Sequence, residues 1–180
     1  MHFQQCFSIK LLCLLSALML PVNVVVAQEL GVPKGVIKLD GSPAPALTLQ
    51  NLDGQAYDLS QSKGHWVFVH FWASWCGPCR KELPTINEAM TKLPTSSLEF
   101  VFINTAETED TVFTFLAITA PDIVPLMDND GLVTERWQPR GLPSTFFIDP
   151  QGNKRYLALG GRPWNEPEYL NFLKLITMQK

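Results

Sequence analysis

Two cysteines, Cys76 and Cys79, are separated by Gly77 and Pro78 and follow an almost wholly apolar run. A thiolate is the nucleophile of disulfide exchange, and a Cys-x-x-Cys pair can cycle between dithiol and disulfide. A disulfide that serves stability gains most when it closes a long loop, whereas this loop is nearly the shortest that a chain can close. The pair is therefore predicted to do redox chemistry and not to serve as a structural bridge.

The residues around the pair predict a buried strand that runs into a helix. Residues 66–72 are short, almost wholly apolar and rich in Val and aromatics, which is typical of a central strand covered on both faces. Cys76 then lies at a helix N-terminus, where unsatisfied N–H groups and the helix dipole lower the pKa of a thiol. Pro78 suits such a start because its missing N–H is not needed there. Cys76 is expected to attack first, and Cys79, one turn further and shielded from solvent, to resolve the mixed disulfide.

Hydrophobic periodicity predicts an α/β domain over residues 44–180, preceded by an irregular Gly/Pro-rich lead at residues 28–43. A strand, a helix and a strand around the cysteines form a βαβ unit with a right-handed crossover. The expected elements are a hairpin of Ala46–Gln50 and Gln55–Leu59, a strand at 66–72, a helix after Cys79, a strand at Leu98–Asn104, a helix from Glu107, a strand at Ile123–Met127, a helix at Leu132–Gln138, a hairpin of Ser144–Asp149 and Arg155–Leu159, and a helix from Pro167.

The first 27 residues have the order of a secretory signal peptide. Lys10 precedes an apolar run, and small residues ending in Ala27 supply a cleavage site. Cleavage after Ala27 predicts a product that is periplasmic or otherwise exported, whereas an uncleaved segment would anchor the chain in a membrane. Cys6 and Cys13 leave with residues 1–27, so the mature chain keeps only the Cys-x-x-Cys pair.

Composition bounds the remaining classes of function. The chain has 180 residues, enough for one domain with its own core, and a formal net charge of −3, which argues against a nucleic-acid partner. No internal repeat, coiled coil or large apolar stretch of the mature chain suggests assembly, so a monomer is expected.

From about Pro43 to its C-terminus the chain resembles the TlpA/ResA-like family of exported thioredoxin-fold proteins. The resemblance implies a thioredoxin-like fold, in which a central mixed β-sheet is flanked by helices, with an N-terminal β-hairpin and a TlpA-type inserted helix and strand. The matching segments are Ala44-Pro45 with Asp53-Gly54, residues 71–82 (FWASWCGPCRKE) and residues 141–149 (GLPSTFFID).

The resemblance also implies residues that contact the partner protein. Trp75 would form a flat apolar rim that protects the disulfide and touches the client, with ordinary core packing as the alternative. Pro143, preceded by Leu142, matches the family's cis-proline beside the disulfide. A cis bond there would turn a backbone edge toward the client, which could add as a short strand.

Two ionisable residues could tune the cysteines. Glu82 matches the acidic residue of the ResA-like branch, and its place on the helix puts it near Cys79, where a carboxylate would raise thiol pKa values and could relay a proton. Solvation on the helix surface is the alternative. His70 stands six residues before Cys76, where thioredoxin has a buried acid. A neutral buried imidazole could exchange a proton with Cys79, a protonated one would make the protein more oxidising, and a hydrogen-bonded core histidine would do neither.

Other sites for a cysteine pair fit less well. Zinc needs four ligands, and the mature chain offers only Cys76, Cys79, His65 and His70, so no metal is expected. Haem attachment needs a histidine after the second cysteine, where Arg80 stands. No cofactor is expected. A metal- or client-binding assembly factor, which would hold its client without net electron transfer, is the alternative function.

The sequence as a whole predicts an exported thiol-disulfide oxidoreductase with a WCGPC motif. Gly-Pro between the cysteines resembles reducing thioredoxins more than oxidising DsbA-type proteins, which favours a reductant. Its clients would be disulfides of exported proteins, such as apocytochromes awaiting haem in cytochrome c biogenesis. Its electrons would come from a membrane reductase of the DsbD/CcdA type.

Overall fold

The structure is a computed structural model that describes residues 31–93 and 98–178. The expected signal peptide and its cleavage site at Ala27 lie outside these residues. Within them, no helix is long and apolar enough to cross a membrane.

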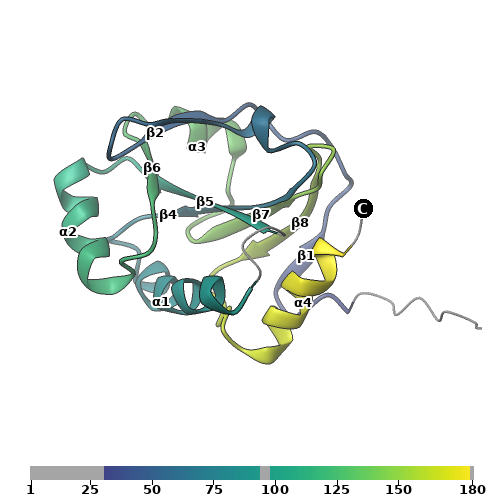
Figure 1. Cartoon of the computed structure of the whole chain (residues 1–180). Coiled ribbons are helices and arrows are strands. Elements are labelled where there is room, and N and C mark those ends of the chain that lie inside the picture. The colour runs from purple at the N-terminus through teal and green to yellow at the C-terminus, as the bar shows by residue number, and fades with distance from the viewer. Residues whose placement is uncertain (1–30, 94–97, 179–180) are drawn as a thin grey trace, which may run out of the picture.

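In the described part of the chain, eight strands form one mixed sheet in the order β1-β8-β7-β4-β5-β6-β2-β3 (Figure 1). The strands are β1 (Val36–Lys38), β2 (Thr48–Asn51), β3 (Ala56–Asp58), β4 (Trp66–Trp72), β5 (Leu98–Thr105), β6 (Pro125–Asp128), β7 (Ser144–Ile148) and β8 (Lys154–Leu159). The helices are α1 (Gly77–Lys92), α2 (Glu109–Thr119), α3 (Leu132–Trp137) and α4 (Pro167–Thr177), with a 3-10 turn at Leu59–Ser62.

Strand β4 lies in the middle of the sheet and is buried along its whole length. It pairs in parallel with β5 and antiparallel with β7, so both of its backbone edges are used. Because β4 ends where β7 begins, with Phe71 opposite Ser144, the segments after β4 and before β7 meet at one end of the sheet. This end carries Cys76 and Pro143.

The two faces of β4 belong to two apolar clusters. Trp66, Phe68 and Trp72 pack with the buried residues of α1, α2 and α4. The alternate residues of β4 pack with Val133 and Trp137 of α3 on the other face. Figure 1 shows the same layers, with α1 and α4 against one face of the sheet and α3 against the other. The expected thioredoxin-like α/β fold is confirmed.

The N-terminal lead is not wholly irregular, and this expectation was wrong. Residues Val36–Lys38 form β1, which pairs antiparallel with β8 and completes that edge of the sheet. A further bridge joins Pro43 to Asn153. A three-residue strand between glycines has too little alternation to be recognised from sequence, and its hydrogen bonds to β8 are what order it.

The N-terminal hairpin was predicted correctly. β2 and β3 pair antiparallel around a turn in which Gly54 has φ +75°, a conformation that favours glycine. The Asn51 side chain accepts hydrogen bonds from the backbone N–H groups of Asp53 and Gln55 and so fixes the turn. β2 extends the sheet from β6.

Candidate active site

Cys76 and Cys79 form a disulfide at the junction of β4 and α1, with their Cα atoms 5.3 Å apart. Cys76 is the N-cap residue of α1, and its Sγ accepts a hydrogen bond from the backbone N–H of Cys79 at 3.3 Å. Cys76 is 5% exposed and Cys79 is fully buried. Of the two cysteines, only Cys76 is therefore accessible to an incoming client.

Trp75 lies in solvent, immediately before Cys76, and is 68% exposed. The alternative of core packing is therefore wrong for this residue. A large apolar side chain exposed beside a reactive group is suited to contact with another molecule.

The Leu142–Pro143 peptide bond is cis, as the resemblance implied. Leu142 is partly buried against both apolar clusters. The Pro143 carbonyl accepts a hydrogen bond from the N–H of Gly160 at 2.9 Å. This bond ties the start of β7 to the segment that follows β8.

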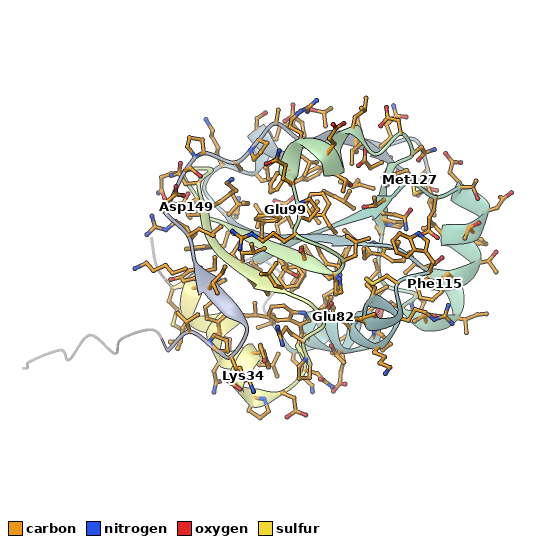
Figure 2. All side chains as sticks on the ribbon, turned by 180° about the vertical axis from the view of Figure 1, so that it is seen from behind. Lys34, Glu82, Glu99, Phe115, Met127 and Asp149 are labelled. Atoms are coloured by element: carbon orange, nitrogen blue, oxygen red, sulfur yellow. A yellow bond between two sulfur atoms is a disulfide. The ribbon has the colours of Figure 1, made fainter. Side chains whose placement is uncertain are left out.

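Glu82 lies on the buried side of α1 and is only 2% exposed, so the alternative of surface solvation is wrong. Its Oε1 accepts hydrogen bonds from the indole N–H of Trp164 and from the backbone N–H of Arg162. Figure 2 shows the labelled Glu82 on α1, beside the segment that leads into α4. Burial raises the pKa of Glu82 to about 8, although the two hydrogen bonds act in the opposite direction.

His70 is fully buried on β4. Its Nδ1 is 2.9 Å from the hydroxyl of Thr145, which stands opposite it on β7. Burial lowers the pKa of His70 to about 3, so the imidazole is neutral at pH 7.

His70, on β4, and Glu82, on α1, face each other between the sheet and the helix. The distance from His70 Nε2 to Glu82 Oε2 is 3.9 Å, and neither atom has a hydrogen-bond partner among the described residues. Two side chains that usually carry charge are thus buried together, and both are predominantly neutral near pH 7.

A cleft of about 510 Å³ opens beside the first turn of α1. Gly161 lines one side of it and packs so closely against the start of α1 that a Cβ there would stand only 3.3 Å from the Pro78 carbonyl oxygen. The cleft is lined by Gly77, Pro78, Lys81, Glu82, Thr85, Gly161, Arg162 and Pro163.

Three residues that hold the ionisable pair were not found from the sequence: Thr145, Arg162 and Trp164. Trp164 is fully buried against Phe68, with ring centroids 5.0 Å apart, while its indole reaches Glu82. A tryptophan in a loop before the last helix gives no sequence signal for this contact. Thr145 could have been proposed from its place two residues after Pro143, next to the strand that carries His70.

Similarity to known proteins agrees with this geometry. The AhpC/TSA family matches residues 41–157. The thiol-disulfide oxidoreductase ResA of Bacillus subtilis (strain 168) is 30% identical over 136 residues, which cover 75% of this chain and 76% of the relative. ResA of Geobacillus kaustophilus (strain HTA426) is 32% identical over 123 residues, covering 67% and 69%. The chain belongs to the TlpA/ResA-like family of thiol-disulfide oxidoreductases.

This TlpA/ResA-like chain also resembles solved structures of thiol-disulfide proteins. A Chlorobium tepidum protein assigned as the thiol:disulfide interchange protein DsbE superimposes with a TM-score of 0.68 at 30% identity, over 76% of this chain and 96% of that one. The exposed lipoprotein thioredoxin Etrx1 of Streptococcus pneumoniae (strain TIGR4) gives 0.62 at 26% identity, over 73% and 99%. The predicted family and the predicted enzyme class are confirmed.

Proposed function

We propose that this TlpA/ResA-like protein reduces disulfides of exported proteins, with Cys76 as the nucleophile and Cys79 as the resolving thiol. The observation that carries the proposal is the placement of the two sulfurs. Cys76 caps α1 and keeps a small exposed area, whereas Cys79 is fully buried one turn along the same helix. A thiolate at the N-cap is stabilised by about 0.3–1 kcal/mol through the helix dipole, and this favours Cys76 as the attacking group.

The reaction balances within the pair. The Cys76 thiolate attacks one sulfur of the client disulfide, so that a Cys76–client bond forms and the second client sulfur leaves as a thiolate. Cys79 then loses its proton and attacks Cys76 Sγ. The Cys76–Cys79 disulfide forms, the other client sulfur is released, and two electrons have passed to the client.

Glu82 serves the second step as the proton exchanger for Cys79. Glu82 stands three residues after Cys79 on α1, on the same helix face. With a pKa of about 8 it can both accept and return a proton near neutral pH, which is the property that a general base for a thiol requires. His70, being neutral, adds no fixed positive charge that would favour a thiolate.

Two features support a reductant: the neutrality of His70 and the Gly-Pro between the cysteines. A protonated histidine would stabilise the reduced thiolate and make the protein an oxidant, and burial keeps His70 unprotonated. The predicted leader at residues 1–27 supports export, and the relative Etrx1 is an exposed lipoprotein. Apocytochromes awaiting haem remain the proposed client class, and a DsbD/CcdA-type membrane reductase the proposed electron donor.

The reduction potential tests the direction. The purified protein would be equilibrated in thiol–disulfide buffers and followed by tryptophan fluorescence. A two-electron transition near about −250 mV or lower is expected for a reductant, whereas a value near about −120 mV would identify an oxidant. Absence of a reversible transition would favour the assembly-factor alternative.

Client capture tests the order of attack. A Cys79→Ser variant lacks the resolving thiol and should accumulate mixed disulfides with proteins of the exported fraction, each joined through Cys76. The matched Cys76→Ser variant should capture far less, because its remaining thiol is buried. Equal capture by both variants would remove the assigned order.

A further inference from the structure

Ser74, two residues before the nucleophile, is held by hydrogen bonds on both of its peptide groups. Its backbone N–H donates to Glu107 Oε2 at 2.7 Å, and its hydroxyl donates to Glu107 Oε1. Its carbonyl accepts from the guanidinium of Arg80 at 3.3 Å. Each of these partners lies on a different element from the β4–α1 loop that carries Ser74.

The Glu107 carboxylate is itself fixed by the end of β5. Asn104, fully buried, donates its side-chain N–H to Glu107 Oε2 at 2.7 Å. Between these two residues Ala106 has φ +55°, a left-handed conformation that is strained for a non-glycine residue. The Ala106 N–H bonds to the Asp128 carbonyl at the end of β6, which holds this bend in place.

Arg80 is held in turn by α2. Its guanidinium carbon lies 5.2 Å from the ring centroid of Phe115 on α2, within the range of a cation–π contact. Phe115 packs on Trp72, the last residue of β4, with centroids 5.7 Å apart. Figure 2 shows the labelled Phe115 at this side of the molecule. The loop before Cys76 is therefore bounded by β5 on one side and by α1 and α2 on the other.

We propose that Glu107 is a positioning residue which, by clamping Ser74 together with Arg80, holds Cys76 in the place from which it forms the disulfide with Cys79. The Glu107 carboxylate accepts three hydrogen bonds, and the Ser74 carbonyl accepts one from Arg80. Together these bonds fix the orientation of the two peptide groups of Ser74, directly before Trp75. The clamp thus gives the segment between β5 and α2 a role, because its Glu107 supports the loop that bears the nucleophile.

The consequence concerns the reduced protein. In the oxidised form the Cys76–Cys79 bond ties the loop to α1, but in the dithiol form only non-covalent contacts hold it. A clamped loop keeps the two sulfurs at a high effective concentration and so favours closure of the disulfide. Loss of the clamp shifts the equilibrium between the two folded forms toward the dithiol.

The test is the equilibrium constant of the protein disulfide with glutathione at pH 7. Glu107→Gln should shift it toward the dithiol by about tenfold. Ser74→Ala, which removes one hydrogen bond without changing charge, should shift it by about threefold, because only part of the stabilisation from a hydrogen bond to a charged group is coupled to closure of the disulfide. The double variant should shift no further than Glu107→Gln. The single amide oxygen of the glutamine is needed by the two N–H donors at the Oε2 position, which leaves its NH2 group opposite the Ser74 hydroxyl, so this hydroxyl can no longer donate there.

Two controls separate positioning from other effects. Glu109→Gln removes a carboxylate at the exposed start of α2 and should leave the constant unchanged. Ser74→Thr keeps the hydroxyl and should behave like the wild type. A merely structural role would lower the unfolding free energy of both redox forms equally and leave the constant unmoved. A shift in Glu107→Gln with none in Ser74→Ala would mean that the charge acts alone, and either result would overturn the proposal.

The inference rests on the proposed function only in that Cys76 and Cys79 exchange as a pair with an external thiol. The glutathione equilibrium needs no protein client, so failure of Cys79→Ser to capture one would refute the assigned client and leave the clamp untouched. If the equilibrium constants of Glu107→Gln and Ser74→Ala were unchanged while Cys79→Ser captured clients normally, the clamp would be refuted and the proposed function would stand.

Discussion

Because His70 and Glu82 are buried together, the free energy of unfolding of the oxidised protein should be constant over a middle pH range and fall at both higher and lower pH. The folded pKa of Glu82 is raised from 4.5 to about 8, so between these values the folded protein holds a proton that the unfolded chain has lost. The folded pKa of His70 is lowered from 6.5 to about 3, so between these values the unfolded chain holds a proton that the folded protein lacks. The first effect destabilises the fold as pH rises, and the second as pH falls.

The two slopes can be combined because each amounts to about 1.36 kcal/mol per pH unit. Between pH 4.5 and 6.5 they cancel, since folded and unfolded chains each hold one proton on the pair. From pH 6.5 to 8 only Glu82 acts, and the free energy of unfolding should fall by about 2 kcal/mol. From pH 4.5 to 3 only His70 acts, with a similar fall. The disulfide keeps the cysteines out of this titration.

Urea unfolding of the oxidised protein at half-unit steps from pH 3 to 9 measures both arms. In Glu82→Gln the alkaline arm should vanish, because the amide can still accept from Trp164 but cannot ionise. In His70→Asn the acid arm should vanish, although the smaller side chain costs stability at every pH. Glu88→Gln, an exposed carboxylate on the same helix, is the control and should keep the alkaline arm. An alkaline arm that persists in Glu82→Gln would refute the assignment.

Three further predictions follow from particular contacts. Trp75→Ala should leave the unfolding free energy within about 0.5 kcal/mol, but it should slow the reduction of a protein disulfide about tenfold and the reduction of a small disulfide far less. The control Phe113→Ala, which removes an exposed aromatic of α2, should change neither rate. Equal slowing with both substrates would argue against contact between Trp75 and the client. Gly35→Ala should cost more on urea unfolding than Gly54→Ala. A Cβ at Gly35 would lie 2.2 Å from the Arg162 guanidinium carbon, so the guanidinium must move and lose its hydrogen bond to the Leu159 carbonyl, whereas Gly54 has a similar φ but open space and should cost only the backbone strain, about 1 kcal/mol. Equal costs would show that backbone strain alone decides. Trp164→Phe removes a donor to Glu82, so the alkaline arm should extend to higher pH in the same titration, and an unchanged arm would mean that the indole does not tune Glu82.

The sequence allowed prediction of what depends on local pattern and on a short motif. The apolar run of β4, the helix that begins beside Cys76 and the Asp53-Gly54 hairpin all carry their signal within about ten residues. The cis bond before Pro143 came from resemblance, because an X–Pro bond is cis in only about 5–6% of cases. The strand β1 was missed, since its order comes from pairing with β8 some 120 residues away in sequence and not from its own composition.

The site was predicted as separate residues and not as contacts. Cys76, Cys79 and Trp75 follow from their places along one helix start. The contacts of Glu82 with Arg162 and Trp164, and of Ser74 with Glu107, join segments 33 to 82 residues apart. Such contacts depend on how loops close over the sheet, and no periodicity in a single sequence encodes this.

The meeting of His70 and Glu82 nevertheless follows from two periodicities taken together. On β4, position 70 shares its face with Phe68 and Trp72, and this face packs on α1. On α1, position 82 belongs to the buried side with Cys79 and Ile86. An imidazole and a carboxyl group on two faces that pack together must either pair as ions or be buried as neutral groups. Burial as separate ions would cost several kcal/mol each, so the lowered pKa of the histidine and the raised pKa of the acid are two consequences of one arrangement, in which both groups are buried in their neutral forms.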